Sequence, residues 1–294
     1  MDQAENLRNI IKRQSVKTVN NSKVYAVTSG KGGVGKSSTS INLALQFRRL
    51  GKNVVILDAD FGMANIEVMF GVIPKYNLSD LLFKDKGIKD IVSIGPEGVG
   101  FISGGSGIAK LVDIDKEQIR RLIDKMAELE DMADIIIVDT GAGIAPSVME
   151  FLVACPEILL VTTPEPTSIT DSYALLKALG MNSNFDSNAT KIRMIANRVS
   201  SESEGRRVFE KLSAVVTRFL NIELDFLGVV PQDKDITKAI MKQKPVSIMF
   251  PNSASARHFE LIAKKLDNKS GAEDVMTDRK GIRGYLKTMF SNKQ

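Results

Sequence analysis

Seven short apolar runs are spaced along the first 230 residues of the chain, and none of them alternates with polar positions. Strands that are apolar on both faces are typical of a parallel sheet covered by helices on both sides. The runs cover Val24–Val27, Asn53–Leu57, Val99–Ser103, Ala133–Asp139, Glu157–Thr163, Lys191–Ala196 and Phe226–Val230. We therefore predict an α/β fold with a mostly parallel, twisted sheet of about seven to eight strands.

Segments with a helical period separate or follow these runs. A helix is predicted directly after Ser38, because apolar residues recur at helical spacing from Ile41 to Phe47. Further helices are predicted at Lys116–Met132, Ser168–Leu179, Lys238–Gln243 and Ala254–Leu266. Because strands and helices follow one another, the connections between parallel strands should be right-handed crossovers.

The stretch Thr28–Ser38 reads T-S-G-K-G-G-V-G-K-S-S and joins the first apolar run to the first helix. Within it, Gly30–Ser37 fits the phosphate-loop pattern G-x-x-x-x-G-K-[ST]. Glycines let the backbone approach a ligand closely, and successive N–H groups at a helix N-terminus attract anions. In this pattern Lys36 reaches the β- and γ-phosphates, and the Ser37 hydroxyl binds Mg²⁺. The expected phosphate-binding residues are Gly30, Lys31, Gly32, Gly33, Val34, Gly35, Lys36, Ser37 and Ser38.

A second lysine, Lys31, lies inside this loop, although a loop that only holds phosphate needs one ammonium group. With Lys31 included, the sequence G-K-G-G-V-G-K-S resembles the deviant Walker A loop of the MinD/ParA class of ATPases. The resemblance implies a MinD-like P-loop NTPase fold, ATP or ADP with Mg²⁺ as ligands, and slow, dimer-dependent ATP hydrolysis. In that class the additional lysine reaches the partner's nucleotide, so Lys31 is expected to couple ATP binding to homodimerisation.

Acidic residues end two of the predicted strands. Asp58 and Asp60 follow one apolar run, and Asp139 ends another in a Walker B arrangement. Carboxylates at the carboxyl ends of parallel strands lie at the ligand-binding edge of an open sheet. Asp139 is therefore expected to hold Mg²⁺ directly or through water.

The family resemblance assigns further roles around these acids. It implies that Asp58 supports the Mg²⁺ shell, that Asp60 positions the attacking water and that Asn65 lies in the first switch region, which senses the γ-phosphate. Together with Lys31 and Lys36, Asp60 forms the expected catalytic set. The segment Thr140–Gly143 corresponds to the second switch, and its Gly141 stands where the family more commonly has proline.

The base of the nucleotide is expected near the ends of two later strands. Asn197 and Arg198 follow the sixth apolar run, and Pro231 follows the seventh. By resemblance, Asn197 contacts the adenine edge, and the backbone around Pro231 flanks the base.

The positive charge belongs to the two ends of the chain. The formal net charge is +5, with +3 in residues 1–23, +5 in residues 279–294 and −3 in the remainder. Basic ends indicate anionic partners such as a membrane surface, nucleic acid or an acidic protein. We predict a partner-binding segment with a linker at 1–23, an ATPase domain at 24–266, a linker at 267–278 and a terminal helix at 279–294.

The N-terminal segment is predicted to form a short amphipathic helix over residues 1–13, although ends of chains are often frayed. Its sequence D-Q-A-x-x-L-R resembles the activator motif of the FlhG (YlxH) family of flagellar MinD-like ATPases. In that family the motif binds the GTPase FlhF and stimulates GTP hydrolysis. The matching residues are Asp2, Gln3, Ala4, Leu7 and Arg8, with Gln3 the candidate to act near the partner's nucleotide.

The C-terminal segment carries an apolar stripe at helical spacing, with basic residues beside it. A basic helix with an apolar face lies either in a membrane interface or against the body of the protein. Its similarity to the membrane-targeting helix of MinD-type proteins favours the membrane. The stripe consists of Ile282, Tyr285, Leu286, Met289 and Phe290.

The remaining composition restricts the function further. Cys155 is the only cysteine, which excludes an intrachain disulfide and a multi-cysteine metal site, and it is predicted to be a buried structural thiol. The only histidine, His258, is predicted to be an ordinary helix residue. No secretory signal is recognised and no apolar stretch reaches the roughly 20 residues of a membrane span, so a cytoplasmic protein is expected.

Taken with both end segments, the resemblance implies an ATP-dependent, membrane-associating homodimer that regulates the number and placement of flagella. Its expected partners are FlhF, the flagellar switch (C-ring) proteins and the cytoplasmic face of the membrane near the flagellar site, with no specific nucleic acid. A MinD-type division-site regulator and a ParA-type DNA segregation ATPase are the alternatives. The N-terminal extension argues against the first, and the −3 charge of the body argues against the second. Iron–sulfur carrier ATPases use a cysteine pair, which this chain lacks.

Overall fold

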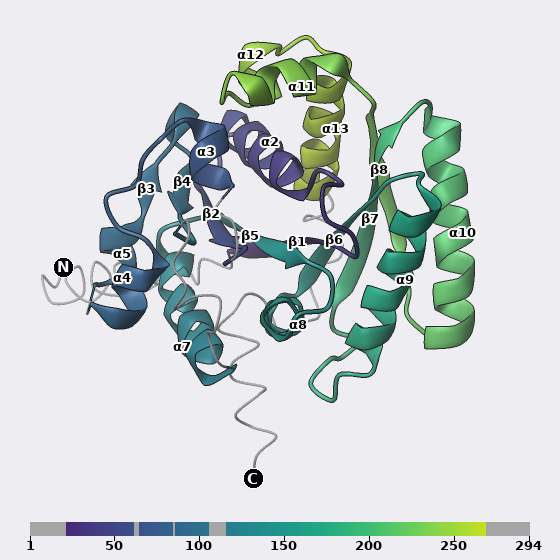
Figure 1. The fold of residues 1–294 in the computed structure, drawn as a ribbon, viewed down its shortest axis with the longest axis horizontal. Helices are drawn as coiled ribbons and strands as arrows, with labels where there is room; N and C mark the ends of the chain where they lie inside the picture. Colours follow the sequence, from purple (N-terminus) through teal and green to yellow (C-terminus); the bar gives the residue numbers. More distant parts are fainter. Residues whose placement is uncertain (1–21, 62–64, 85, 106–115, 269–294) are drawn as a thin grey trace, which may run out of the picture.

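The computed structural model describes residues 22–61, 65–84, 86–105 and 116–268 of the chain. Within them, eight strands form one sheet in the order β3-β4-β2-β5-β1-β6-β7-β8 (Figure 1). All neighbouring strands are parallel except β3, which runs antiparallel to β4. The strands are β1 (Lys23–Ser29), β2 (Val54–Ala59), β3 (Ser93–Ile94), β4 (Gly100–Ile102), β5 (Ile135–Ala142), β6 (Glu157–Thr162), β7 (Lys191–Val199) and β8 (Asp225–Pro231). The predicted fold class and strand number are confirmed.

Helices cover both faces of this sheet, as Figure 1 shows. One face carries α2 (Lys36–Arg49), α3 (Ile66–Phe70), α11 (Lys234–Met241), α12 (Val246–Met249) and α13 (Ala254–Asn268). The other carries α4 (Leu78–Phe83), α5 (Ile88–Ile91), α7 (Lys116–Met126), α8 (Pro146–Ala154), α9 (Pro166–Gly180) and α10 (Glu202–Leu220). Two 3₁₀ turns, η1 (Pro96–Gly98) and η2 (Ala127–Asp131), complete the described elements. None of these helices combines the length and apolar character needed to cross a bilayer.

The apolar runs are buried because each central strand contributes side chains to two hydrophobic clusters. In β1, Val24 and Ala26 belong to the cluster under α8 and α9, whereas Tyr25 and Val27 belong to the cluster under α2 and α13. Successive side chains of a strand point to opposite faces, so a strand in the middle layer must be apolar at every position. This explains why the runs lack polar alternation.

Several predicted boundaries differ from the observed ones. The helix predicted for Lys116–Met132 ends at Met126 and continues as the 3₁₀ turn η2. The helix predicted for Lys238–Gln243 begins at Lys234, because the Asp233 side chain accepts a hydrogen bond from the backbone N–H of Asp235 at 2.9 Å and caps it. Strand β7 runs on to Val199, past the predicted end at Ala196.

Candidate nucleotide site

The glycine-rich loop joins β1 to α2 at the edge where the parallel strands have their carboxyl ends. Gly35 precedes α2 as its N-cap with φ 98°, a left-handed conformation that favours glycine. A Cβ on Gly30 would overlap the backbone of Asp171 and Ser172 in α9. By contrast, a Cβ on Gly32 would meet nothing within 4 Å. One end of the loop is thus packed against α9, while its middle is open to a ligand.

The Asn197 side chain forms a hydrogen bond to the phosphate loop. Its side-chain Nδ2 donates to the carbonyl oxygen of Val34 at 2.7 Å, and its Oδ1 accepts from the backbone N–H of Arg198 at 2.9 Å. The side chain is buried, and Arg198 has φ 57°. Asn197 therefore connects the end of β7 to the phosphate loop. The predicted contact of Asn197 with adenine stays a prediction.

Lys36 is buried in the first turn of α2. Burial lowers the pKa of its ammonium group, while the carboxylates of Asp139 and Asp60 oppose that shift. The lysine predicted to reach the phosphates therefore lies in the same charged cluster as two of the predicted acids. This arrangement suits a group that has to receive the negative charge of a triphosphate.

Asp139 is fully buried within β5, which runs past the predicted strand end at Asp139 and ends at Ala142. Its Oδ1 accepts a hydrogen bond from the Ser40 hydroxyl at 2.8 Å, while Oδ2 is buried without a hydrogen-bond partner among the described residues. Burial raises the pKa of Asp139 to about 6, against the effect of the Ser37 and Ser40 hydroxyls and of Lys36. A buried carboxylate oxygen with an unused lone pair, beside the Ser37 hydroxyl, fits a bound Mg²⁺ ion or its water.

Asp58 lies beside Asp139, because β2 and β5 pair these two residues in register. Its Oδ1 accepts from the backbone N–H of Asp60 at 3.2 Å, and its Oδ2 accepts from those of Asn65 at 2.9 Å and Ile66 at 3.2 Å. Burial and the neighbouring charge of Asp139 raise the pKa of Asp58 well above its usual range. Oδ2 thus holds the start of α3 and Oδ1 holds the residue that follows β2, while the predicted role of Asp58 at Mg²⁺ stays a prediction.

Asp60 faces the segment predicted to be the second switch. A Cβ on Gly141 would lie 3.8 Å from Asp60 Oδ1 and 3.4 Å from Val148. The backbone N–H of Gly143 donates to the carbonyl oxygen of Ser29 at 2.9 Å. The end of β5 is therefore hydrogen-bonded to the start of the phosphate loop, and Asp60 lies beside the predicted second switch.

Lys31 lies on the rim of the site and contacts the start of α9. Its ammonium group donates to Glu165 Oε2 at 2.7 Å and to the Thr167 hydroxyl at 2.9 Å. Its side chain is 36% exposed, and the pKa of Glu165 is lowered by this hydrogen bond and by the charge of Lys31. Within the chain, Lys31 thus points to α9 rather than toward Lys36 and the acids.

Residues 25–246 match the family model described as the CobQ/CobB/MinD/ParA nucleotide binding domain. The chain belongs to this family. The family model describes a nucleotide binding domain, so this chain is assigned nucleotide binding, and the roles of the loop and of the acids described above stay predictions.

Relatives of this MinD/ParA-family ATPase include an antiactivator and a flagellum site-determining protein. Antiactivator FleN of Pseudomonas aeruginosa is 43% identical over 245 residues, which cover 83% of this chain and 86% of FleN. Flagellum site-determining protein YlxH of Helicobacter pylori is 33% identical over 295 residues and 98% of both chains. The septum site-determining protein MinD from Pyrococcus horikoshii, solved with Mg-ADP, shares the fold with a TM-score of 0.71 at 24% identity over 87% of this chain and all of that one.

The structure of the ATPase brings most of the predicted site residues to one edge of the sheet. One cluster contains the phosphate loop with Lys36, Ser37, Asp58, Asp60 and Asp139. Asn197 contacts this cluster through its hydrogen bond to Val34 of the loop. Pro231 ends β8 at the same edge and pairs with Val199. Residues 2–8 and 282–290, with the predicted partner and membrane segments, lie outside the described residues.

Four supporting hydrogen bonds of the ATPase were not anticipated. Glu165 and Thr167 hold Lys31, and the Ser40 hydroxyl binds Asp139. The hydroxyls of Thr162 and Ser172 are 2.8 Å apart and fasten the end of β6 to α9. Ser40 could have been found, because it lies one helical turn beyond Lys36, on the same face of α2. Glu165 carries no such local signal.

Proposed function

We propose that this ATPase regulates the number and placement of flagella by switching between a monomer and an ATP-bound dimer. The observation that carries the proposal is its similarity to FleN and YlxH over most of each chain, at higher identity than the MinD structure with the same fold. The same nucleotide site would serve a division or segregation switch. The flagellar assignment therefore rests on these two relatives and on the N-terminal motif.

In this proposal, different residues of the nucleotide site bind the phosphates, hold Mg²⁺ and orient the attacking water. Lys36 and the amides of the glycine-rich loop bind the phosphates, and Ser37 with Asp139 holds Mg²⁺. The ion, when bound, neutralises charge that develops on the phosphates. Asp60 orients the attacking water from its place beside the second switch segment. Asp58 holds Asn65 at the start of α3, so a change at the γ-phosphate would be passed to that helix.

Lys31 supplies the link between nucleotide and dimer. To reach a partner's phosphate, its ammonium group must leave Glu165 and Thr167, which lie on the rim in the same chain. Glu165 is 53% exposed, so this ion pair contributes little free energy and is easily exchanged for a triphosphate. The ATP-bound dimer is then favoured by a contact that ADP, without a γ-phosphate, makes poorly.

The two end segments connect this switch to its surroundings. Residues 1–23, with Gln3 in the motif, bind the GTPase FlhF and stimulate its GTP hydrolysis. Residues 279–294, joined by a linker at 267–278, lie on the cytoplasmic face of the membrane. Two such helices in a dimer bind more strongly than one, because the second binds at a high effective concentration. Proteins of the flagellar C-ring are the other expected binding partners.

Deletion of the gene in its native cell tests the function. We expect an altered number or position of flagella by electron microscopy, restored by the wild-type gene but not by Lys31→Ala. Purified Lys31→Ala should still bind ATP but remain monomeric by light scattering. Minicells or filaments in the deletion strain would instead indicate a division-site regulator, and cells without DNA a segregation ATPase. Normal flagella in the deletion strain would refute the proposal.

The N-terminal segment is tested separately. A chain lacking residues 1–14 should bind ATP as the wild type does but no longer stimulate GTP hydrolysis by purified FlhF. Gln3→Ala should reduce the stimulation without unfolding the body. GTPase stimulation that survives the deletion would show that the activator lies elsewhere in the chain.

A further inference from the structure

A patch of apolar and basic side chains lies where the segment after α3 meets the end of α11. Ile73 and Met241 are 96% and 79% exposed, the two highest fractions among the large apolar side chains of the described residues. The two segments touch, because a Cβ on Gly71 would lie 3.3 Å from the carbonyl oxygen of Gln243. We call this surface the α3–α11 patch, and it consists of Ile73, Lys75, Met241, Lys242 and Lys244.

The patch carries positive charge that no carboxylate of the described residues neutralises. Lys75, Lys242 and Lys244 form no ion pair with a carboxylate among the described residues. Lys75 lies over the ring of Tyr76, with 5.2 Å between its ammonium group and the ring centroid. The nearest acid of α11 in sequence, Asp235, is paired with Lys238 at 2.7 Å. Two exposed apolar anchors are thus accompanied by three lysines.

Both halves of the patch are connected to the nucleotide edge. Helix α3 begins at Ile66, whose N–H donates to the buried Asp58 at 3.2 Å. Helix α11 begins directly after β8 and is capped by Asp233, which also accepts from the Ser255 hydroxyl at 2.8 Å. A displacement of Asp58 or of the end of β8 on nucleotide binding would therefore shift one half of the patch against the other.

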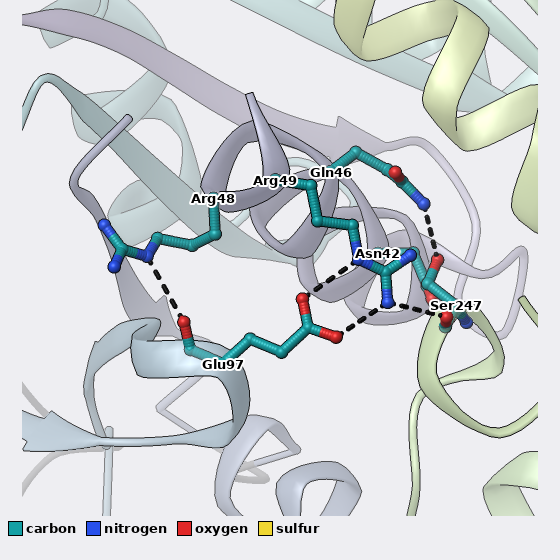
Figure 2. Close-up of polar contacts among 6 residues, drawn as sticks. All are labelled: Asn42, Gln46, Arg48, Arg49, Glu97 and Ser247. Carbon is teal, nitrogen blue, oxygen red and sulfur yellow. Dashed lines mark hydrogen bonds and ion pairs between the residues drawn. The ribbon is translucent and has the colours of Figure 1, made fainter. Parts of the chain in front are cut away.

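A polar cluster between α2 and α12 fixes the α11 side of this arrangement (Figure 2). Asn42 Oδ1 accepts from the backbone N–H of Ser247 at 3.0 Å, and Gln46 Nε2 donates to the Ser247 hydroxyl at 3.1 Å. Arg49 donates to the carbonyl oxygen of Ser247 at 2.9 Å and forms an ion pair with Glu97 at 2.7 Å. Helix α2, which follows the phosphate loop, thereby holds α12, and α12 comes directly after the patch residues Met241, Lys242 and Lys244.

We propose that the α3–α11 patch is a docking surface for an acidic segment of another protein that carries large apolar side chains. The apolar side chains would cover Ile73 and Met241, and the carboxylates would pair with Lys75, Lys242 and Lys244. Buried apolar anchors surrounded by charge pairs are the usual source of affinity and orientation in such contacts. The affinity of the patch for this segment depends on the bound nucleotide, because α3 and the end of β8 connect the two halves of the patch to the nucleotide edge.

Two other occupants fit the patch less well. A second copy placed symmetrically would bring the same lysines against one another. A membrane requires a longer apolar face than two side chains provide. In addition, α13 ends and β1 begins at the opposite edge of the sheet, where Lys23 Nζ donates to the carbonyl oxygen of Leu266 at 3.2 Å. A segment that continues from α13 therefore leaves the body at the edge opposite the start of α11.

The first experiment uses the full chain in its native cell, with the photocrosslinking residue p-benzoylphenylalanine in place of Met241. The matched control carries it in place of Met181, which is 77% exposed at the end of α9 on the other face of the sheet. We expect a protein adduct only from position 241, attached to an acidic segment with apolar side chains. Adducts to lipid or to a second copy, equal yields from both positions or no adduct would overturn the proposal.

The second experiment measures binding of that segment as a labelled synthetic peptide to the purified full chain by fluorescence anisotropy. Charge reversal in Lys242→Glu/Lys244→Glu should weaken binding by about tenfold or more. Lys211→Glu on α10, an exposed lysine of the other face, should leave it unchanged. Affinities with ATP and with ADP should differ. Unfolding curves check that both variants fold, and equal weakening by both would refute the patch.

Discussion

Asp58 and Asp139 lie at paired positions of neighbouring strands, and both are fully buried. Two carboxylates so close together and away from water cannot both be ionised without cost, and Lys36 offsets only part of it. The folded protein without nucleotide therefore carries a destabilising charge at the point where Mg²⁺ is expected. Binding of the ion recovers that free energy, which couples the stability of the fold to occupancy of the site.

Asp139→Asn should therefore stabilise the nucleotide-free protein while weakening Mg²⁺ binding. A carboxylate whose folded pKa is about 6, against 3.8 when unperturbed, destabilises the fold by roughly 3 kcal/mol once it is ionised. Loss of a carboxylate beside Lys36 reduces the gain, so we expect about 1–3 kcal/mol at pH 7.5, measured by urea unfolding.

The pH dependence provides the control for this variant. The raised pKa means that the destabilisation is complete above about pH 6 and vanishes below about pH 4, where the carboxyl is protonated in both states. The gain from Asp139→Asn should disappear over the same range. A thermal shift by ADP that still depends on Mg²⁺ in the variant would contradict the assigned role.

Cys155 is a second residue whose titration is set by burial. The thiol is fully buried, which raises its pKa to about 12 from an ordinary value of 9.0. It should therefore resist alkylation by iodoacetamide at pH 8 in the native protein and react in 6 M urea.

The same raised pKa gives a stability effect with a defined sign. The contribution is complete below about pH 9 and is lost as the pH rises toward 12, since only the unfolded thiol ionises in that interval. Rapid, complete labelling of the native protein at pH 8 would show that the thiol is accessible and would refute its assignment as structural.

Roles that depend on strand ends could be predicted from the sequence, whereas contacts between distant elements could not. Asp139 was placed because it follows the apolar run of a parallel strand, and acids at that position lie near the ligand edge of the sheet. The support that Asn197 gives to Val34 joins residues 163 positions apart, and the contact of Lys31 with Glu165 spans 134. Such pairs depend on the order of the strands in the sheet, which apolar patterning leaves undetermined.

At the scale of elements, the strands were easier to predict than the helices. Helices α8 and α10 are absent from the predicted elements. Residues Val148–Ala154 of α8 are buried at every position, and their apolar run merges with that of β6, so no helical period separates the two. Helix α10 does carry a signal that could have found it, because Ser201 caps it and Val208, Leu212 and Val216 recur every four residues.

The polar cluster of α2 and α12 in Figure 2 allows an element-scale test. Ser247→Ala removes the acceptor of Gln46, a side chain only 4% exposed, so its amide is left buried without that partner. We expect a loss of about 1–3 kcal/mol in the free energy of unfolding. Urea unfolding measures it.

A double-mutant cycle separates the hydrogen bond from packing. Gln46→Leu/Ser247→Ala removes both polar partners and should recover much of the stability lost in Ser247→Ala. Additive losses in the two single variants would mean that the Gln46–Ser247 bond contributes nothing specific to the contact between α2 and α12.

At the scale of the whole molecule, the body and its end segments are separable in their expected functions. The described residues form one sheet with two hydrophobic clusters. The start of β1 and the end of α13 lie together at the edge of the sheet opposite the nucleotide edge. Changes in the tail should therefore leave nucleotide binding intact.

The membrane proposal for the tail predicts ATP-dependent co-sedimentation with liposomes that contain anionic lipid. Ile282→Glu or Phe290→Glu should abolish sedimentation, because each places a charge in the apolar stripe. Asn292→Glu, outside the stripe, is the matched control. Sedimentation unchanged by both stripe variants would mean that the tail is not the membrane anchor.

The hydrogen bond from the Lys23 ammonium group to the carbonyl oxygen of Leu266 has a consequence for chain connectivity. Since the start of β1 and the end of α13 are neighbours, the body is nearly a closed loop of polypeptide. A short peptide from Asn268 to Ser22 would circularise it, and new ends could be opened in the exposed turn around Asn184. In such a permuted chain the ATPase would be covalently complete without either tail, and each tail could be attached at a site of the experimenter's choosing.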